Sequence, residues 1–359
     1  MPEQIPFTRG VPSTDLLPIE QLRASAATAF ETDAVTTLSY TPNGHPGLRA
    51  WIGERHGVPS DQVICTNGSL EVFSFVCAVL LEQAATRRVI VEAPTYDRSI
   101  LLLRRLGAEI VAVPVDRDGL VVEALEEVLA DGVPALVYTI PNFQNPSGTT
   151  LSEPRRHELC ELAARHGFTI VEDDPYGLLR WAGATAPSLF SLAPDRVVTM
   201  SSFTKTVAPG LRVGYAVAAP QRAKAIGAYA TNTYIAPSMP AQATLAAYCA
   251  AGHFEPGVAR ATEALHERCD AMVEAVRARF PARARFVVPE GGYFLWVDLG
   301  DGAETSELAV RAQTAGVPFV PGSDFYADGS GTSQLRLAFS AVAPAQIREG
   351  IERLGGIIS

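Results

Sequence analysis

One lysine with serine and threonine neighbours is the most chemically informative feature of this sequence. Lys205 lies in MSSFTKTVAPGLRV, beside Ser202 and Thr204, and Arg212 follows seven positions later. An apolar, β-rich run precedes this segment, so the lysine stands at the end of a buried strand, where desolvation lowers its pKa and suits it to form a Schiff base. The hydroxyls and the arginine can hold a phosphate. A lysine beside a phosphate cradle is what a pyridoxal-phosphate site needs, whereas the alternative is a surface turn that carries the same residue types.

A carboxylate at the end of another predicted strand could complete that site. Asp173 follows the apolar run FTIVE and precedes Asp174. A carboxylate there can pair with the pyridine nitrogen of the cofactor and keep it protonated, so that the ring accepts electrons from a substrate carbanion. The alternative is that EDD is only a polar strand end.

The join between a strand and a helix in CTNGSLEVF is a further phosphate candidate. Gly68 and Ser69 stand where the helix begins. The first backbone N–H groups of a helix, with the helix dipole behind them, favour a phosphate dianion. An ordinary helix N-cap has the same residue types.

Arg336, in QLRLAFS, is the candidate clamp for the α-carboxylate of an amino-acid substrate. A bidentate arginine would fix the substrate so that its Cα–H bond stands perpendicular to the ring plane. The alternative is an edge-strand arginine whose charged head lies in water.

The alternation of apolar runs and helical patterns between about residues 60 and 220 indicates which elements position these side chains. It predicts an α/β fold whose large domain has a mostly parallel sheet covered on both faces. After Pro237 the pattern changes to long helices and short strands, which indicates a smaller α+β domain. We predict strands over 88–93, 109–115, 135–140, 169–172, 197–201, 213–219, 286–288, 293–297 and 334–339, and helices over 69–81, 99–106, 122–130, 153–166, 241–251, 254–280 and from 344 onward.

In order and spacing, these motifs resemble those of pyridoxal-phosphate enzymes of fold type I, the aspartate-aminotransferase superfamily. The likeness is strongest to the branch of aromatic-amino-acid, 2-aminoadipate and kynurenine aminotransferases and MocR catalytic domains. It extends from IPFTRGVPSTDLLPIEQLR through YTPNGHPGLRAWIGERHGV, YTIPNFQNPSGTTLS and GGYFLWVDL to LRLAFS. It implies an N-terminal segment (1–34) that packs with the small domain, a large cofactor-binding domain (35–237) and a small C-terminal domain (238–359).

The resemblance assigns the candidate cofactor residues. Asp173 is preferred over Asp174 because the family's carboxylate lies three residues before a tyrosine, here Tyr176. Tyr176 and Asn145 would hydrogen-bond the phenolic oxygen of the cofactor, and Tyr96, in APTYDRS, would stack on its ring. With Lys205 as the catalytic lysine, the positions expected around the phosphate are Gly68, Ser69, Leu70, Ser202, Thr204 and Arg212.

Two further positions bear on the phosphate. A glutamine usually follows the serine in this branch, but Leu70 stands there, so only its backbone N–H remains and one side-chain contact is lost. Tyr40, before TPNGHPGLR, would place its hydroxyl on the phosphate of the neighbouring subunit's cofactor. The resemblance therefore implies a homodimer with a shared active site.

The substrate side of the site is expected to include Arg336, Asn145 and Gly10. Gly10, in FTRGVPS, would let substrate approach the backbone closely. Arg9 replaces a residue that is often small in this branch, and it either meets a distal substrate carboxylate or points to solvent. Plausible pocket walls are Tyr234, Tyr293 and Phe294.

Composition limits the compartment and the partners. The net charge of −10 argues against non-specific binding to nucleic acid or to an anionic membrane, and no apolar window could span a bilayer. Five cysteines without C-x-x-C spacing, and an N-terminus without signal-peptide features, indicate the cytoplasm. The six histidines have no ligand spacing, so we expect no metal.

The expected activity is transfer of an amino group between an L-amino acid and a 2-oxo acid. The alternative is an enzyme of the same fold that uses pyridoxal phosphate for elimination, replacement, cyclisation or oxidation of an amino acid in a specialised biosynthetic pathway. A ligand-sensing module, as in MocR regulators, is a third possibility. It is disfavoured because only about thirty residues precede the first motif, too few for a winged-helix domain.

Overall fold

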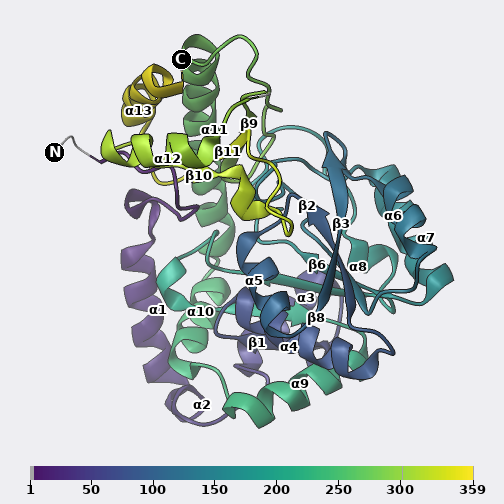
Figure 1. The fold of residues 1–359 in the computed structure, drawn as a ribbon. Coiled ribbons are helices and arrows are strands. Elements are labelled where there is room, and N and C mark those ends of the chain that lie inside the picture. The colour runs from purple at the N-terminus through teal and green to yellow at the C-terminus, as the bar shows by residue number, and fades with distance from the viewer. Residues whose placement is uncertain (1–3, 301, 359) are drawn as a thin grey trace.

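A large mixed sheet forms the centre of the fold (Figure 1). The structure is a computed structural model that describes residues 4–300 and 302–358. The pairs that link β3, β2, β5, β6 and β7 are parallel, whereas β1, β8 and β4 pair antiparallel at the two edges. The prediction of a mostly parallel sheet is confirmed. In spatial order the strands are β1 (Val63–Thr66), β8 (Gly214–Val217), β7 (Val197–Ser202), β6 (Thr169–Asp173), β5 (Leu136–Thr139), β2 (Arg88–Ala93), β3 (Glu109–Asp116) and β4 (Gly119–Leu120).

Helices cover both faces of this sheet. Alternate strand residues enter opposite cores: Val89 and Val91 join one hydrophobic cluster and Ile90 the other. The first cluster includes side chains of α4 (Ser69–Gln83), α5 (Asp97–Arg105) and α9 (Pro220–Tyr234). The second includes side chains of α3 (Pro46–His56), α6 (Val122–Leu129), α7 (Glu153–His166), α8 (Leu189–Leu192) and α10 (Met239–Ala250).

A three-stranded antiparallel sheet lies above the large one in Figure 1. Its central strand carries Arg336, which lies opposite Trp296 on one neighbour and Val320 on the other. The long helix α11 (Phe254–Arg279) packs along α13 (Pro344–Ile358) beside this sheet. The order is β10 (Val320–Pro321), β11 (Gln334–Ala338) and β9 (Phe294–Asp298), and the remaining helices are α1 (Ile19–Thr32), α2 (Ala34–Leu38) and α12 (Thr305–Thr314).

Most elements lie where the sequence predicts them. Helix α7 has the predicted bounds because Pro154 suits its first turn and Gly167 ends it in a left-handed conformation. The strand predicted over 286–288 is wrong: only Arg285 bridges to Asp298, and Val287 and Val288 are exposed. The two domain boundaries stay predictions. Helix α10, which follows the predicted boundary at 237, packs against α1 and also against α3 of the predicted large domain.

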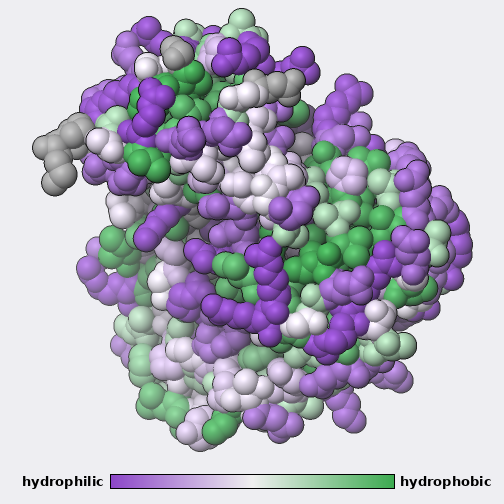
Figure 2. All heavy atoms as spheres, viewed as in Figure 1, coloured by the Kyte–Doolittle hydropathy of each residue, from purple (hydrophilic) through white to green (hydrophobic). Residues whose placement is uncertain are grey.

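The surface seen from this side is mostly hydrophilic. Figure 2 shows hydrophobic residues gathered over β3, between α5 and α6, with hydrophilic residues around them. Within the described part of the chain, no helix is long and apolar enough to cross a membrane.

A buried arginine fixes the loop that joins β5 to α7. The Arg156 side chain is fully buried, and its Nε donates to the Leu151 carbonyl at 2.9 Å. Its Nη2 donates to the Pro141 carbonyl at 3.0 Å and to Asn142 Oδ1 at 2.7 Å, and its Nη1 donates to the Pro187 carbonyl at 3.0 Å. One guanidinium therefore holds both ends of the loop that carries Asn145.

We expect Arg156→Met to lower the free energy of unfolding by about 3 kcal/mol or more, because it leaves several buried acceptors without donors. Urea denaturation at a fixed cofactor concentration measures this. Arg165→Met on the same helix is the matched control, because its partner Glu126 is equally exposed and such surface pairs contribute about 1 kcal/mol at most. Equal losses for the two variants would contradict the assignment.

Candidate active site

The carboxyl ends of the parallel strands meet at one cavity, as is usual for ligand sites in open α/β sheets. The cavity has a volume of about 530 Å³ and lies between the large sheet and the three-stranded sheet. The structure brings most of the predicted site residues together in its lining: Arg9, Gly10, Ser69, Leu70, Tyr96, Asn145, Asp173, Tyr176, Ser202, Thr204, Lys205, Arg212 and Arg336.

Lys205 stands just beyond β7, as predicted, and its amine faces the cavity. Its Nζ donates to the Gly10 carbonyl at 2.5 Å and lies 5.9 Å from the ring centre of Tyr176. The Tyr293 hydroxyl donates to the Lys205 carbonyl at 2.8 Å and so fixes the backbone. Burial, and then the Arg336 charge, lower the pKa of Lys205 to about 8. The neutral, nucleophilic amine is therefore available near neutral pH.

Asp173 ends β6 with one carboxylate oxygen free. Its Oδ2 accepts a hydrogen bond from the Tyr138 hydroxyl at 2.8 Å, whereas Oδ1 is buried and has no partner among the described residues. Burial raises the pKa of Asp173 to about 7, and the Tyr138 hydrogen bond opposes that shift. A buried carboxylate oxygen without a donor requires one, and an N–H of a bound ring would supply it.

Asp174, the alternative carboxylate, is already satisfied. It accepts from Asn142 Nδ2 at 2.9 Å and from the Gly177 backbone N–H at 2.8 Å. It is not among the residues that line the cavity. The geometry thus favours Asp173 over Asp174 as the carboxylate that faces a ligand.

The opposite end of the cavity has the composition of an anion site. Ser69 and Leu70 open α4, so their N–H groups have no acceptor within the helix. A Cβ at Gly68, where φ is 105°, would collide with the Arg212 guanidinium, so only glycine lets the arginine lie against the helix start. Arg212 itself has a φ of 52°, a rare conformation for a side-chain-bearing residue.

Two hydroxyls border this anion site. The Ser202 hydroxyl donates to Thr204 Oγ1 at 2.7 Å and accepts from the Thr204 N–H at 3.0 Å. Both residues line the cavity with Ser69, Leu70 and Arg212. The residues predicted to bind the phosphate therefore lie together. Gly68 lies next to them, and its missing side chain leaves room for the Arg212 guanidinium.

Arg336 is a buried cation without a carboxylate partner. Its Nη1 donates to Asn145 Oδ1 at 2.7 Å and its Nη2 to the Thr8 carbonyl at 2.7 Å, but Nε has no acceptor in the described structure. The guanidinium lies between the rings of Phe294 and Phe325, at 4.3 and 4.7 Å from their centres. Burial lowers the pKa of Arg336. A buried guanidinium without a carboxylate in contact is suited to receive one from a ligand.

The N-terminal segment closes one side of the cavity. Gly10 packs so closely on the Phe294 ring that a Cβ would collide with it, and the Gly10 carbonyl contacts Lys205. Gly10 is thus required by packing, a reason that the sequence did not show. Arg9 lines the cavity but is exposed, and its side chain makes no hydrogen bond or ion pair with any described residue.

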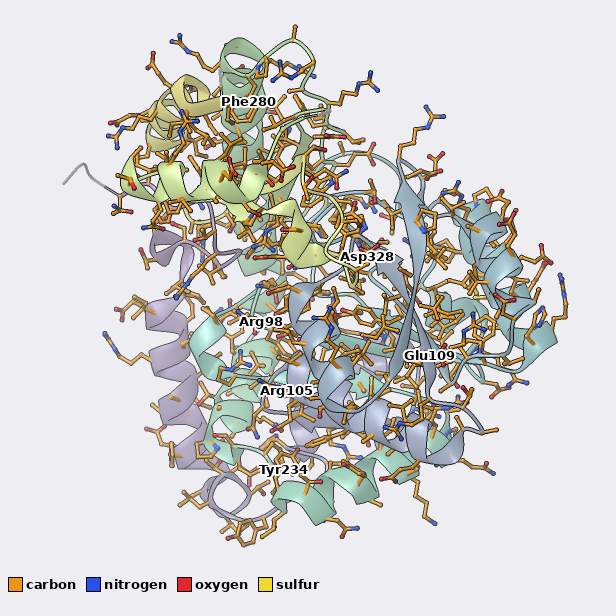
Figure 3. All side chains as sticks on the ribbon, viewed as in Figure 1. Arg98, Arg105, Glu109, Tyr234, Phe280 and Asp328 are labelled. Carbon is orange, nitrogen blue, oxygen red and sulfur yellow. The ribbon has the colours of Figure 1, made fainter. Side chains whose placement is uncertain are left out.

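Three predicted residues lie elsewhere. Tyr234 as a pocket wall is wrong: its hydroxyl donates to the Cys65 carbonyl at 3.3 Å, and Figure 3 shows it at the lower end of the molecule. Tyr293 lies beneath Lys205 and does not line the cavity, although its neighbour Phe294 does. Tyr40 is 79% exposed and does not line this cavity; its predicted contact, with the partner subunit's cofactor, stays a prediction.

The sequence did not reveal Tyr138, which is fully buried in β5 between apolar residues and looks like ordinary core. Its contact with Asp173 depends on β5 and β6 being neighbours, and no local motif encodes that neighbourhood. Asp97, Arg98 and Asp324 also line the cavity and were not predicted.

The residues present fit pyridoxal phosphate. Asp173 Oδ1 lacks a donor, a depressed-pKa lysine faces the cavity, and an anion site of helix N–H groups, hydroxyls and an arginine lies at one end. Tyr96 lines the same cavity, and burial raises the pKa of its hydroxyl to about 12.

Comparison with known proteins agrees with this geometry. The family model for aminotransferase class I and II matches residues 2–354. The 2-aminoadipate transaminase of Thermus thermophilus is 34% identical over 359 residues, which cover 99% of this chain and 90% of that protein. The aromatic-amino-acid aminotransferase 1 of Thermococcus litoralis is 33% identical over an alignment that covers 99% of this chain and 88% of that protein. The solved structure of the Thermus thermophilus α-aminoadipate aminotransferase, complexed with N-(5'-phosphopyridoxyl)-L-leucine, matches with a TM-score of 0.94 at 33% identity, covering 99% of this chain and 92% of that one.

The lowered pKa of Lys205 predicts a pH-dependent cost of folding. Below pH 8 the folded protein holds this amine charged in a buried place, and the cost disappears as pH rises toward the ordinary value of 10.5. In cofactor-free protein we expect Lys205→Met to be more stable than wild type by roughly 3 kcal/mol at pH 7, with the difference largely gone at pH 10. Urea denaturation at both pH values measures it. Lys224→Met, at an exposed lysine, is the control, and a difference that does not change with pH would refute the prediction.

Proposed function

Because this chain belongs to the class I and II aminotransferases, which use pyridoxal phosphate, we propose that the cavity around Lys205 holds this cofactor and exchanges an amino group between an L-amino acid and a 2-oxo acid. One observation carries the assignment of residues. Lys205 Nζ, the free Asp173 Oδ1 and the free Arg336 Nε belong to buried ionisable groups that face one cavity without a charged partner in contact. Lys205 Nζ suits the carbonyl carbon of the cofactor, Asp173 Oδ1 its ring nitrogen, and Arg336 Nε the α-carboxylate of the substrate.

The proposed cofactor contacts follow from position. Asp173 would face the ring nitrogen, Tyr96 the ring, and Tyr176 and Asn145 its phenolic oxygen. Tyr138 would hold the Asp173 carboxylate in place through its 2.8 Å hydrogen bond. The phosphate would lie against the N–H groups of Ser69 and Leu70 and the side chains of Ser202, Thr204 and Arg212.

The bound cofactor supplies a carbonyl carbon that condenses with amines and a protonated ring that accepts an electron pair. Lys205, whose pKa is lowered to about 8, has a neutral fraction near neutral pH. It would hold the cofactor, take the proton from the substrate Cα and deliver it to the cofactor's C4′ carbon. Arg336 binds the α-carboxylate and fixes the Cα–H bond in the reactive orientation. The ring of Phe294 and the segment 8–11 line this part of the cavity.

The proposed substrate has an aromatic or medium-length side chain, with glutamate and 2-oxoglutarate as the exchange pair. The names of the two relatives, for 2-aminoadipate and for aromatic amino acids, support this range. Phe294 and Phe325 supply apolar walls, and Arg9, exposed and without a partner, is available to a distal carboxylate.

We also propose a homodimer in the cytoplasm, with the three parts 1–34, 35–237 and 238–359. Val35, Leu38 and Tyr40 are 79%, 70% and 79% exposed on and after α2, and a partner subunit would cover these side chains. Five free, buried cysteines support a reducing compartment.

The test of the activity uses the purified holoenzyme. An L-amino acid added without an acceptor should yield one equivalent of 2-oxo acid per site, and an added 2-oxo acid should then restore the starting absorbance. Borohydride reduction should attach the cofactor to the peptide that contains Lys205, since Lys224 is the only other lysine. Ammonia release through many turnovers, or a tag on Lys224, would contradict the proposal.

The shared site predicts complementation between two inactive variants. If Tyr40 reaches the partner's phosphate, a heterodimer of Lys205→Ala and Tyr40→Ala has one site with both residues intact. Mixing and refolding the two should restore about a quarter of wild-type activity, because half the dimers are mixed and each has one intact site. Mixing Lys205→Ala with Lys205→Met is the control and should restore none. Full activity of a monomer would refute the shared site.

A further inference from the structure

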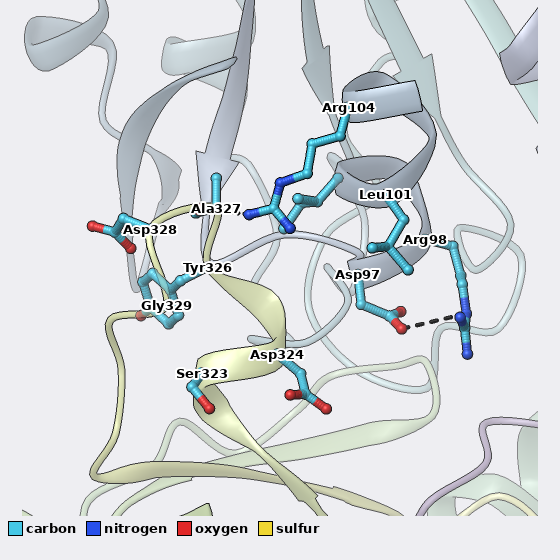
Figure 4. Close-up of a pocket in the computed structure, with 11 residues that line it drawn as sticks. Asp97, Arg98, Leu101, Arg104, Ser323, Asp324, Tyr326, Ala327, Asp328 and Gly329 are labelled. Atoms are coloured by element: carbon cyan, nitrogen blue, oxygen red, sulfur yellow. Dashed lines mark hydrogen bonds and ion pairs between the residues drawn. The ribbon is translucent and has the colours of Figure 1, made fainter. Parts of the chain in front are cut away.

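A second chamber opens beside the reaction cavity. It has a volume of about 570 Å³ and lies between α5 and the 3₁₀ helix η4 (Gly322–Phe325) with the loop that follows (Figure 4). Asp97, Arg98 and Asp324 line both spaces. The two spaces therefore share a polar boundary made by these three residues, the junction between them.

One wall of the chamber comes from α5, which follows β2 of the large sheet, and the other from η4, which follows β10 of the three-stranded sheet. Asp97 and Arg98 stand at the start of α5, whereas Asp324 lies in η4, after the strand that precedes Arg336. Arg104 ties the walls together by donating to the Ala327 carbonyl at 2.6 Å. Figure 3 shows Arg98 on α5 and Asp328 on the loop above it.

The charges of this chamber leave one carboxylate free. Arg98 Nε pairs with Asp97 Oδ2 at 3.4 Å, and Arg104 is occupied by the Ala327 carbonyl. Asp328 accepts from the Ser330 hydroxyl at 2.7 Å. Asp324 has no hydrogen bond or ion pair from its side chain to any part of the chain that the structure describes, and Figure 4 shows it facing the Asp97–Arg98 pair.

Asp324 and Asp97 are close enough to repel each other. Burial and then the Asp97 charge raise the pKa of Asp324. The charges of Arg336 and Arg98 oppose that shift. Once a substrate α-carboxylate neutralises Arg336, two carboxylates and the Arg98 guanidinium leave the junction between the two spaces with a net negative charge. A cation at this junction would pair with Asp324 and remove the repulsion.

The cavity also contains an independent sign of its ligand. Arg336 is 7% exposed, has an unpartnered Nε and lines the same space as Asp97 and Asp324. Both carboxylates act on Arg336 electrostatically, since each raises its pKa against the effect of burial. A substrate that places its α-carboxylate on Arg336 therefore has its side chain within reach of the junction.

We propose that Asp324, supported by Asp97, binds the positively charged end of the substrate side chain, an amine or a guanidinium. This proposal rests on the proposed function and narrows its substrate range, from aromatic or medium-length side chains to medium-length side chains that end in a cation. An anionic side-chain end fits this junction less well, because both arginines of the chamber already have partners. Arg9 lines only the reaction cavity and stays available for the dicarboxylate of the other half-reaction.

The test compares single-turnover rates of the holoenzyme with L-lysine, L-arginine, L-norleucine and L-2-aminoadipate. Norleucine is lysine without its amine, so it isolates the charge. We expect lysine or arginine to exceed norleucine in kcat/KM by about tenfold to a hundredfold, the range for a hydrogen bond to a charged group. Asp324→Asn should bring this ratio close to one, and Asp324→Lys should turn the preference toward 2-aminoadipate.

The control is Asp328→Asn, on the same loop, whose carboxylate is bonded to Ser330; it should keep the wild-type ratio. The inference is overturned if norleucine reacts as well as the basic amino acids, if 2-aminoadipate is preferred by the wild type, or if Asp324→Asn slows all substrates equally. These outcomes leave the aminotransferase assignment intact. If none of the four amino acids, glutamate or phenylalanine forms a 2-oxo acid, the proposed function fails as well.

Discussion

Burial of an amine and a guanidinium in one cavity is the constraint on which the rest of the site depends. The Arg336 charge lowers the pKa of Lys205, and neither group touches a carboxylate of the described residues. The backbone carbonyls of Gly10 and Thr8 accept hydrogen bonds from them instead. Such an arrangement opposes folding and is retained where binding needs it, because anions of the ligand can supply the missing partners.

Rigid surroundings hold these unfavourable groups in place. The β5–α7 loop, which presents Asn145 to Arg336, is fixed from below by the Arg156 guanidinium. Glu92 adds a second support, since it accepts from the Ile140 N–H at 3.1 Å and from Gln144 Nε2 at 2.9 Å. Burial raises the pKa of Glu92 to about 7, so this buried carboxyl also costs stability in its charged form. The precision of the site thus comes from polar groups that are themselves expensive to bury.

The sequence predicted what local pattern encodes. Lys205, Asp173 and Arg336 stand at strand ends or within strands with recognisable flanks, and they lie where the motifs indicate. Contacts that depend on the spatial order of strands could not be predicted in this way. Tyr138 meets Asp173 only because β5 and β6 are neighbours, and Asp324 meets Asp97 across 227 positions of sequence. The wrong strand over 286–288 has β-branched residues, but its pairing with β9 does not extend beyond the bridge between Arg285 and Asp298.

The position of Arg336 on the three-stranded sheet has a mechanical consequence. Lys205 and Asp173 belong to the large sheet, so a ligand that touches all three residues bridges two separately built layers of the molecule. It acts as a removable crosslink whose strength is its own affinity. The free energy of ligand binding therefore adds to the free energy that holds the two sheets together. A change that weakens the packing between the sheets also weakens substrate binding.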